Sequence, residues 1–171
     1  MDSSGELLGS ILILGTAASG KSVFAEGLIG DTEATYVATA EAGDEEMRAR
    51  IEAHKVRRGG NWTTIEEPLD LAGVLDANGH APMLIDCLTL WLSNLMHARY
   101  DAESETIALC RAINDANFPV VLVSNEVGGG IRPDNALARD YQDASGSMNQ
   151  HVAEAADRVY LVTAGIAQQL K

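Results

Sequence analysis

The chain has 171 residues, of which 46% are hydrophobic, and it carries a formal net charge of −13. This length predicts a single domain that can bury an ordinary core without disulfides or a structural metal. The negative charge would repel a nucleic-acid duplex or an anionic membrane over most of the surface, so it excludes both as main partners and favours a small ligand.

The two cysteines, Cys87 and Cys110, lie in apolar stretches without the spacing of a redox or metal motif. This placement predicts reduced thiols and a cytoplasmic protein. The first ten residues contain neither a basic region nor an apolar core, and no later apolar run approaches the length of a membrane span. We therefore expect no signal peptide and no membrane span, a flexible extension over residues 1–10, and one catalytic domain over residues 11–171.

An apolar run from Ile11 to Leu14 is typical of a strand buried on both faces, and it leads directly into the pattern G-x-x-x-x-G-K-S. This pattern is a phosphate-binding loop, because its glycines let the backbone turn around an anion and the next helix points its positive dipole end at the same charge. Lys21 would reach the outer phosphates of a nucleotide, and Ser22 would hold Mg²⁺. The nucleotide-binding residues predicted in the loop are Gly15, Thr16, Ala17, Ala18, Ser19, Gly20, Lys21 and Ser22.

Apolar runs and helical periodicity alternate along the rest of the chain. Further strands are predicted at residues 34–38, 62–65, 83–87, 120–124 and 159–162, the last of them closing the sheet. Helices are predicted at residues 22–29, 44–54, 69–75, 88–96, 103–114 and 136–156. Strands separated by helices specify a mostly parallel sheet with helices on both faces, so we expect an α/β, three-layer fold of the P-loop NTPase type.

Two of the predicted strands end in polar residues that could serve a nucleotide. Asp86 follows the apolar run 83–85, where a P-loop protein places the carboxylate that holds Mg²⁺ near the phosphates, although the same aspartate would also cap the helix from Leu88. Asn125 and Glu126 follow the strand 120–124 in the same way. Their position alone leaves ligand binding and simple capping open.

His54 lies among cations, in the segment RIEAHKVRR of residues 50–58. Neutral imidazole is a competent nucleophile toward phosphorus, but a lone histidine on a helix surface usually has no chemical role, and spacing alone does not separate these alternatives. The neighbouring cations Lys55, Arg57 and Arg58 would attract an anionic nucleotide to this acidic protein.

Taken together, these segments resemble the bifunctional adenosylcobinamide kinase/adenosylcobinamide-phosphate guanylyltransferases of cobalamin biosynthesis. The resemblance covers nearly all of residues 11–171. It includes the phosphate loop, YVATA at 36–40, the helix that carries His54, LIDCLTLWLSNL at 84–95, SNEVG at 124–128 and AAD at 155–157.

The resemblance implies two reactions. A nucleoside triphosphate, ATP or GTP, phosphorylates the hydroxyl of the corrinoid adenosylcobinamide, and GTP then donates GMP to that phosphate through a histidine, which corresponds to His54. It implies that Lys21 and His54 are catalytic, that Ser22 and Asp86 hold Mg²⁺, and that neighbouring subunits of a homotrimer border the sites. The nucleotide contacts that it implies besides the loop are Ala38, Thr39, Ala40, Lys55, Val56, Arg57, Arg58, Glu66 and Asp86.

Burial of the apolar helix face 88–95 between subunits would favour such an assembly. The chain departs from the family pattern in its phosphate loop, where Thr16 and Ala18 replace a glycine and an arginine and remove a cation near the phosphates. Gln142 replaces a second family arginine, a charge that Arg132 would supply instead.

The residues also leave two other functions open. One is a different small-molecule P-loop kinase, in which His54 would have no role. The other is a nucleotide-binding switch that uses the same loop without acting on a metabolite. Formation of a covalent GMP adduct on the protein would distinguish the cobinamide enzyme from both of these alternatives.

Overall fold

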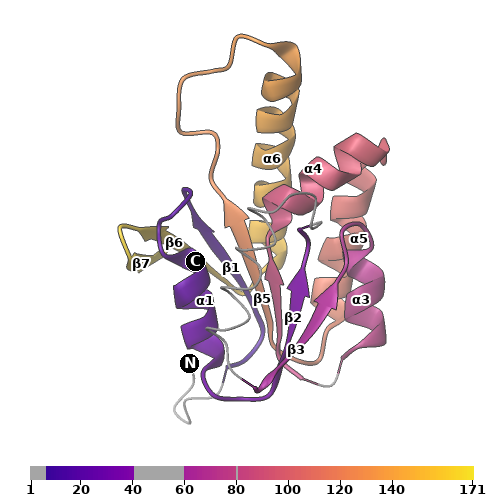
Figure 1. The fold of residues 1–171 in the computed structure, drawn as a ribbon, viewed down its shortest axis with the longest axis vertical. Helices are drawn as coiled ribbons and strands as arrows, with labels where there is room; N and C mark the ends of the chain where they lie inside the picture. Colours follow the sequence, from indigo (N-terminus) through magenta and orange to yellow (C-terminus); the bar gives the residue numbers. More distant parts are fainter. Residues whose placement is uncertain (1–6, 41–59, 80) are drawn as a thin grey trace.

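The computed structural model describes residues 7–40, 60–79 and 81–171. These residues form a seven-stranded sheet in the order β3-β2-β4-β5-β1-β6-β7, in which neighbouring strands are parallel except for the antiparallel pair β6 and β7 (Figure 1). The strands are β1 (Ser10–Gly15), β2 (Ala34–Ala38), β3 (Trp62–Glu66), β4 (Met83–Asp86), β5 (Val120–Asn125), β6 (Arg158–Thr163) and β7 (Ile166–Gln169).

Helices cover both faces of this sheet. The helix α1 (Lys21–Ile29) packs on one face, and α3 (Leu71–Ala77), α4 (Leu88–Ala98), α5 (Ala102–Asp115) and α6 (Ala136–Ala155) pack on the other. The alternation of side chains along β1 divides the core in two, because Leu12 joins the cluster under α3 to α6 whereas Ile11 and Ile13 join the cluster under α1. The predicted three-layer α/β fold is therefore confirmed.

The predicted elements that the structure describes match the observed ones to within two residues at each end, and one strand, β7, was not predicted. The helix predicted from residue 69 begins at Leu71, because the Asp70 side chain caps it by accepting a hydrogen bond from the Gly73 amide at 2.8 Å. The prediction that residues 159–162 close the sheet is wrong, since β7 pairs with β6 across a turn at Ala164 and Gly165, both with positive φ. The helix predicted at residues 44–54 lies outside the described residues.

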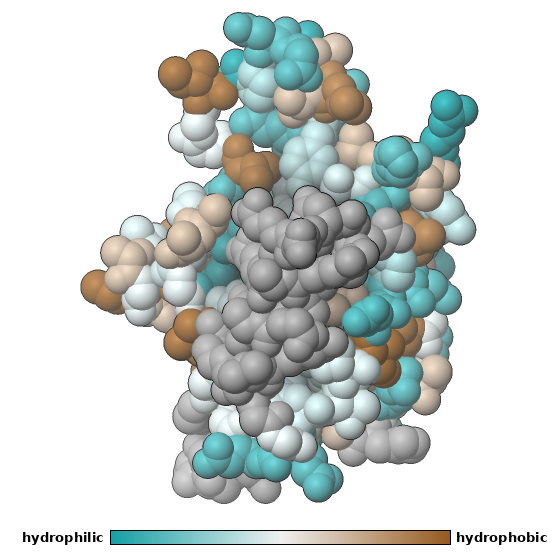
Figure 2. All heavy atoms as spheres, in the orientation of Figure 1, coloured by the Kyte–Doolittle hydropathy of each residue, from teal (hydrophilic) through white to brown (hydrophobic). Residues whose placement is uncertain are grey.

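The apolar helix α4 belongs to the core of the subunit. Leu88, Leu92 and Leu95 are fully buried and Trp91 is 1% exposed, packed against the sheet and the neighbouring helices. The expectation that this helix face is exposed and available to a second subunit is therefore wrong. On the visible face, outside the grey atoms, Figure 2 shows small separated apolar patches rather than one continuous apolar face.

Both cysteines pack within the fold. Cys87 is buried and Cys110 is half-buried, and both are free thiols.

Within the described part of the chain, no helix has the length and apolar character needed to cross a membrane.

Asp157 ties the last part of the fold to the first strand. Its carboxylate accepts hydrogen bonds from the Ser10 amide at 2.7 Å and the Ser10 hydroxyl at 3.0 Å, and these bonds hold its pKa below the ordinary value of 3.8. A lowered folded-state pKa contributes stability that is complete above the unfolded value and is lost as pH falls through the folded one.

We expect Asp157→Ala to lower the free energy of unfolding at neutral pH by about 1 kcal/mol, a modest amount because the carboxylate is largely exposed. Urea unfolding of parent and variant checks this result. The difference between the two proteins should shrink as the pH is lowered through the folded-state pKa of Asp157. A difference that does not change with pH would contradict the assigned role of the charged carboxylate.

The parallel arrangement gathers the strand ends that matter for function at one edge of the sheet. Gly15, Glu66, Asp86 and Asn125 are the last residues of β1, β3, β4 and β5. We refer to this side of the sheet as the carboxyl edge. In open α/β sheets, ligands bind at this edge.

Candidate nucleotide site

The phosphate loop connects β1 to α1 at the carboxyl edge. A side chain at Gly15 would place its Cβ 2.5 Å from the Ser19 hydroxyl and 2.5 Å from the Val162 carbonyl, so the close packing here requires glycine. Gly20 ends the loop with φ of 96°, a left-handed conformation that glycine adopts easily. The Gly165 amide donates to the Ser19 carbonyl at 2.8 Å, so the turn between β6 and β7 supports the loop from behind.

Lys21 is the first residue of α1 and is only 7% exposed. Its Nζ donates a hydrogen bond to the Thr16 carbonyl at 2.8 Å, which holds the ammonium against the loop. The N-cap residue of α1 is Gly20, which has no side chain to cap the helix, so the first amides of α1 can donate to an anion. Ammonium and amides together give this loop the charge and the donors that phosphate oxygens require.

Asp86, at the end of β4, contacts the loop from the neighbouring part of the sheet. Its Oδ2 accepts hydrogen bonds from the Ser22 hydroxyl at 3.1 Å and from the Tyr36 hydroxyl at 3.3 Å. A serine hydroxyl beside one carboxylate is a suitable set for Mg²⁺, which takes few protein ligands and completes its shell with phosphates and water. The described residues contain no group of three or more His, Cys, Asp or Glu residues that could hold a metal without the nucleotide.

Thr39 fixes the ends of β2 and β4 relative to one another. It is fully buried, and its hydroxyl accepts from the Cys87 amide and donates to the Cys87 carbonyl, both at 2.8 Å. Asn94 donates to the Thr39 carbonyl at 2.8 Å and to the Pro68 carbonyl at 3.2 Å. These bonds join β2, α4 and the loop after β3 next to Asp86, whose carbonyl accepts from the Thr39 amide at 3.2 Å. Direct contact of Ala38, Thr39 or Ala40 with a nucleotide stays a prediction.

Glu66 lies on the opposite side of β2 from Asp86. Ala38 pairs with Glu66 on β3 and with Asp86 on β4, so the two carboxylates flank the end of β2. Glu66 is exposed at this edge. The remaining predicted site residues, His54, Lys55, Val56, Arg57 and Arg58, lie outside the described residues.

A partly buried polar network lies next to the site, and of its members only Asn125 was singled out in the sequence as a candidate site residue. Asn125 donates to the Thr89 hydroxyl at 2.6 Å, and Tyr141 donates to the Thr89 carbonyl at 2.9 Å. Asn149 donates to the Asn125 carbonyl at 3.2 Å and accepts from Ser124 at 2.7 Å. The signal was available, because Tyr141 and Asn149 stand eight residues apart and therefore lie on one face of a helix.

Two groups in this network titrate well above neutral pH. Burial, with a smaller effect from Cys87, raises the pKa of Tyr141 to about 12. Burial and the adjacent Asp86 carboxylate raise the pKa of the Cys87 thiol. Both side chains therefore stay protonated at physiological pH, and Tyr141 keeps its hydrogen bond to α4.

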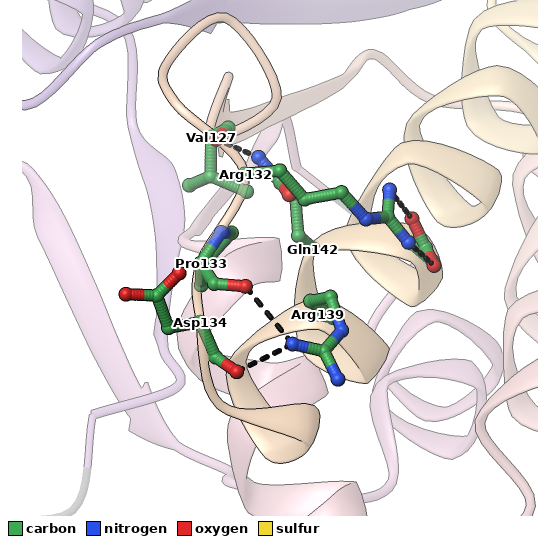
Figure 3. A network of polar contacts seen from close by, with 7 residues as sticks. Val127, Arg132, Pro133, Asp134, Arg139 and Gln142 are labelled. Atoms are coloured by element: carbon green, nitrogen blue, oxygen red, sulfur yellow. Dashed lines mark hydrogen bonds and ion pairs between the residues drawn. The ribbon is translucent and has the colours of Figure 1, made fainter.

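The connection between β5 and α6 projects beyond the carboxyl edge (Figure 1) and is held by the contacts in Figure 3. Gln142 donates to the Val127 carbonyl at 3.1 Å, and Arg139 donates to the carbonyls of Pro133 and Asp134. Arg132 forms a bidentate ion pair with Asp143, at 3.1 and 2.8 Å. The charge of Arg132 is thus paired with that of Asp143, the residue after Gln142, in an exposed position where solvent screens it.

Glu126 follows Asn125 and shapes the start of this connection. Its amide donates to the Gly15 carbonyl at 3.0 Å, and its carboxylate accepts from the Gly128 amide at 2.7 Å. The Glu126 carboxylate therefore caps a turn. Capping is one of the two roles, besides ligand binding, that its place in the sequence left open.

Comparisons with solved structures agree with the P-loop fold. A flagellar accessory protein FlaH from Methanocaldococcus jannaschii matches with a TM-score of 0.52 at 14% identity, covering 95% of this chain and 78% of that one. A KaiC-like protein from Pyrococcus horikoshii matches with a TM-score of 0.55 at 16% identity, covering 90% and 70%. Identities this low support the fold alone.

Sequence comparisons are more specific. The bifunctional adenosylcobalamin biosynthesis protein CobP of Pseudomonas aeruginosa is 44% identical, over 94% of this chain and 96% of its own. CobU of Salmonella typhimurium, which carries the same description, is 41% identical over 94% and 99%. The family profile described as cobinamide kinase / cobinamide phosphate guanyltransferase matches residues 11–170. With relatives this similar and a profile this complete, the chain belongs to the CobU family of cobinamide kinases / cobinamide phosphate guanyltransferases, a family of enzymes.

Proposed function

We propose that this enzyme phosphorylates the hydroxyl of adenosylcobinamide and then transfers GMP from GTP to the new phosphate, yielding adenosyl-GDP-cobinamide and pyrophosphate. One observation carries the proposal: the buried Lys21 in its phosphate loop and the Ser22–Asp86 pair meet at the carboxyl edge in a chain of this family. Both reactions move a charged phosphorus group, so both need the charge stabilisation that such a site offers.

In the first reaction, the substrate hydroxyl oxygen attacks the γ-phosphorus of the nucleotide, and the bond to the bridging oxygen breaks. The Lys21 ammonium and the first amides of α1 would bind the phosphate oxygens and stabilise the charge that moves onto the leaving nucleoside diphosphate. Because Lys21 is almost fully buried, water screens its charge only weakly. Mg²⁺ held by Ser22 and Asp86 would neutralise further phosphate charge.

In the second reaction, we propose that the nucleophile is His54, the residue that the family resemblance implies. A neutral imidazole nitrogen forms a bond to the α-phosphorus of GTP, and pyrophosphate leaves with the electron pair. A phosphate oxygen of adenosylcobinamide phosphate then attacks the same phosphorus and releases the imidazole. The cations predicted after His54, namely Lys55, Arg57 and Arg58, would stabilise the charge of both anionic reactants.

Labelled GTP tests the proposal directly. With Mg²⁺ and α-labelled GTP, the protein should acquire an acid-labile GMP label, and adding adenosylcobinamide phosphate should move that label into adenosyl-GDP-cobinamide. With γ-labelled nucleotide and adenosylcobinamide, it should form labelled adenosylcobinamide phosphate. Comparing ATP with GTP in the second assay identifies the phosphoryl donor. A protein that performs neither reaction would contradict the proposal.

Asp86→Asn should raise the Mg²⁺ concentration needed for half-maximal kinase activity by roughly tenfold or more, because the metal loses a carboxylate near its site. A magnesium titration of the kinase rate measures the shift. Asp76→Asn makes the same charge change at an exposed position of α3 and should leave the titration unchanged. Equal titrations for the parent and Asp86→Asn would remove Asp86 from the metal site.

A homotrimer stays a prediction from the family resemblance. The burial of α4 within the subunit removes the apolar helix face that was expected to form its interface. The exposed large apolar side chains of the described residues are instead dispersed over several elements, with Ile131 and Leu137 on the projecting connection and α6, and Ile166 on β7.

A further inference from the structure

Asn125 occupies a central place at the carboxyl edge. It is the last residue of β5, the strand that lies between β1, which carries the phosphate loop, and β4, which carries Asp86. Asn125 is paired with Gly15 at the start of the loop, and Asp86 is paired with Val123, two residues earlier on β5. A ligand that extends from the loop to Asp86 therefore passes over the end of β5.

The Asn125 carboxamide is anchored at one end. Its Nδ2 donates to the Thr89 hydroxyl at 2.6 Å and lies 4.0 Å from the Cys87 sulfur. The other end carries Oδ1, to which no described residue donates a hydrogen bond. Asn125 is half-buried, so a ligand at this edge can reach it. A fixed amide with an available oxygen is an acceptor for a ligand O–H or N–H group.

The residues around Asn125 hold it from two directions. Thr89 is 4% exposed at the start of α4, and the Tyr141 hydroxyl fixes its backbone carbonyl from α6. The backbone carbonyl of Asn125 accepts from Asn149, whose own oxygen accepts from Ser124. Neither the backbone nor the side chain of Asn125 can turn without breaking these bonds. A catalytic group needs such support, because an error of about 1 Å in position costs roughly a hundredfold in rate.

We propose that Asn125 is a further catalytic residue of the kinase reaction, whose Oδ1 accepts a hydrogen bond from the substrate hydroxyl and directs its oxygen at the γ-phosphorus. This inference rests on the proposed function. The oxygen bonds to phosphorus as the bond to the bridging oxygen breaks, and the nucleoside diphosphate leaves with the electron pair. The hydroxyl proton passes to water, because an amide oxygen is too weak a base to keep it. Guanylyl transfer to the substrate phosphate involves no such hydroxyl, so Asn125 has no corresponding role there.

Asn125→Ala tests the proposal by its effect on the two reactions. We expect the kinase kcat to fall roughly tenfold to hundredfold, while the Kd of the nucleotide and the rate of GMP labelling stay at the parent values. Asn114→Ala removes the same group from an exposed position at the end of α5, at the opposite edge of the sheet, and should change neither reaction.

Two variants of Thr89 test the anchor without altering a group that touches substrate. Thr89→Val preserves the shape but removes the hydroxyl that fixes the amide, so the kinase kcat should fall about fivefold with unchanged nucleotide KM. Thr89→Ser retains the hydroxyl and should restore the rate. Thermal unfolding of each variant shows whether a loss of kinase rate accompanies a loss of stability.

The outcomes separate this proposal from the proposed function. A parent enzyme that makes adenosylcobinamide phosphate while Asn125→Ala makes it equally fast overturns the role of Asn125 alone. Equal losses of kinase rate, GMP labelling and stability in Asn125→Ala or Thr89→Val also overturn it, because they indicate a structural role. A parent that phosphorylates no cobinamide overturns the proposed function and this proposal together.

Discussion

Lys21→Ala should weaken the binding of nucleoside triphosphate and reduce both reactions by roughly 10²–10³-fold, the loss expected when one preorganised charge or donor is removed from developing negative charge. Lys21 is 7% exposed and lies at the start of α1, beside the loop that would surround the phosphates. The effect should be large because, in a chain of net charge −13, the anionic nucleotide depends on local positive charge.

The fold should tolerate this change. The Nζ group of Lys21 donates to the carbonyl of Thr16, an exposed residue whose carbonyl water can solvate in the variant. Calorimetric titration with GTP and initial rates of both reactions measure the effect. Arg111→Ala removes one positive charge from an exposed position on α5 and controls for the change in net charge. Unchanged GTP affinity in Lys21→Ala would show that the loop does not bind phosphate.

Secondary structure was predictable wherever burial imposes a simple pattern on the sequence. β4 and β5 are buried on both faces, and their continuous apolar runs identified them directly. β7 was missed because it is a mostly exposed edge strand of sequence IAQQ, which has little apolar character and pairs with β6 across a tight turn. Its formation depends on the adjacent β6, which a local pattern does not reveal.

The apolar helix α4 marks a different limit. Its leucines and Trp91 form a stripe that predicts burial, but the stripe does not specify whether the partner is the same subunit or another one. The structure resolves this question, because α3, α5, α6 and the sheet supply the partners within one chain.

The site was predictable where a motif fixes both residue type and spacing. The phosphate loop and Asp86 were identified in this way. The hydrogen bond from Ser22 of the loop to Asp86 joins residues that are 64 positions apart in the sequence. The contacts of Thr39 with Cys87 and of Tyr141 with Thr89 were not predicted, because each joins residues from distant elements by bonds to the backbone, which any sequence can provide. Such contacts support the site without forming a motif.

His54→Asn should separate the two activities. Asparagine retains polarity and approximate size but lacks the nucleophilic ring nitrogen, so the GMP label on the protein and the formation of adenosyl-GDP-cobinamide should both fall to background. Adenosylcobinamide phosphate should still accumulate, because phosphoryl transfer to a hydroxyl needs positioning and charge neutralisation rather than a covalent partner. Incubation with α-labelled GTP and chromatography of the corrinoid products measure the two effects in one sample.

His97→Asn supplies the matched control, since His97 is exposed in the last turn of α4 and should tolerate the same replacement with both activities intact. Retention of the GMP label by His54→Asn would place the covalent intermediate on another residue, and His80 would be the next position to replace. Loss of both reactions together would instead mean that the segment around His54 also binds the nucleotide of the kinase step. In that case, Lys55→Ala or Arg57→Ala, which remove cations that follow His54, should weaken nucleotide binding, while the GMP label should still form at saturating GTP. This result would distinguish nucleotide binding by the segment from the covalent role of His54.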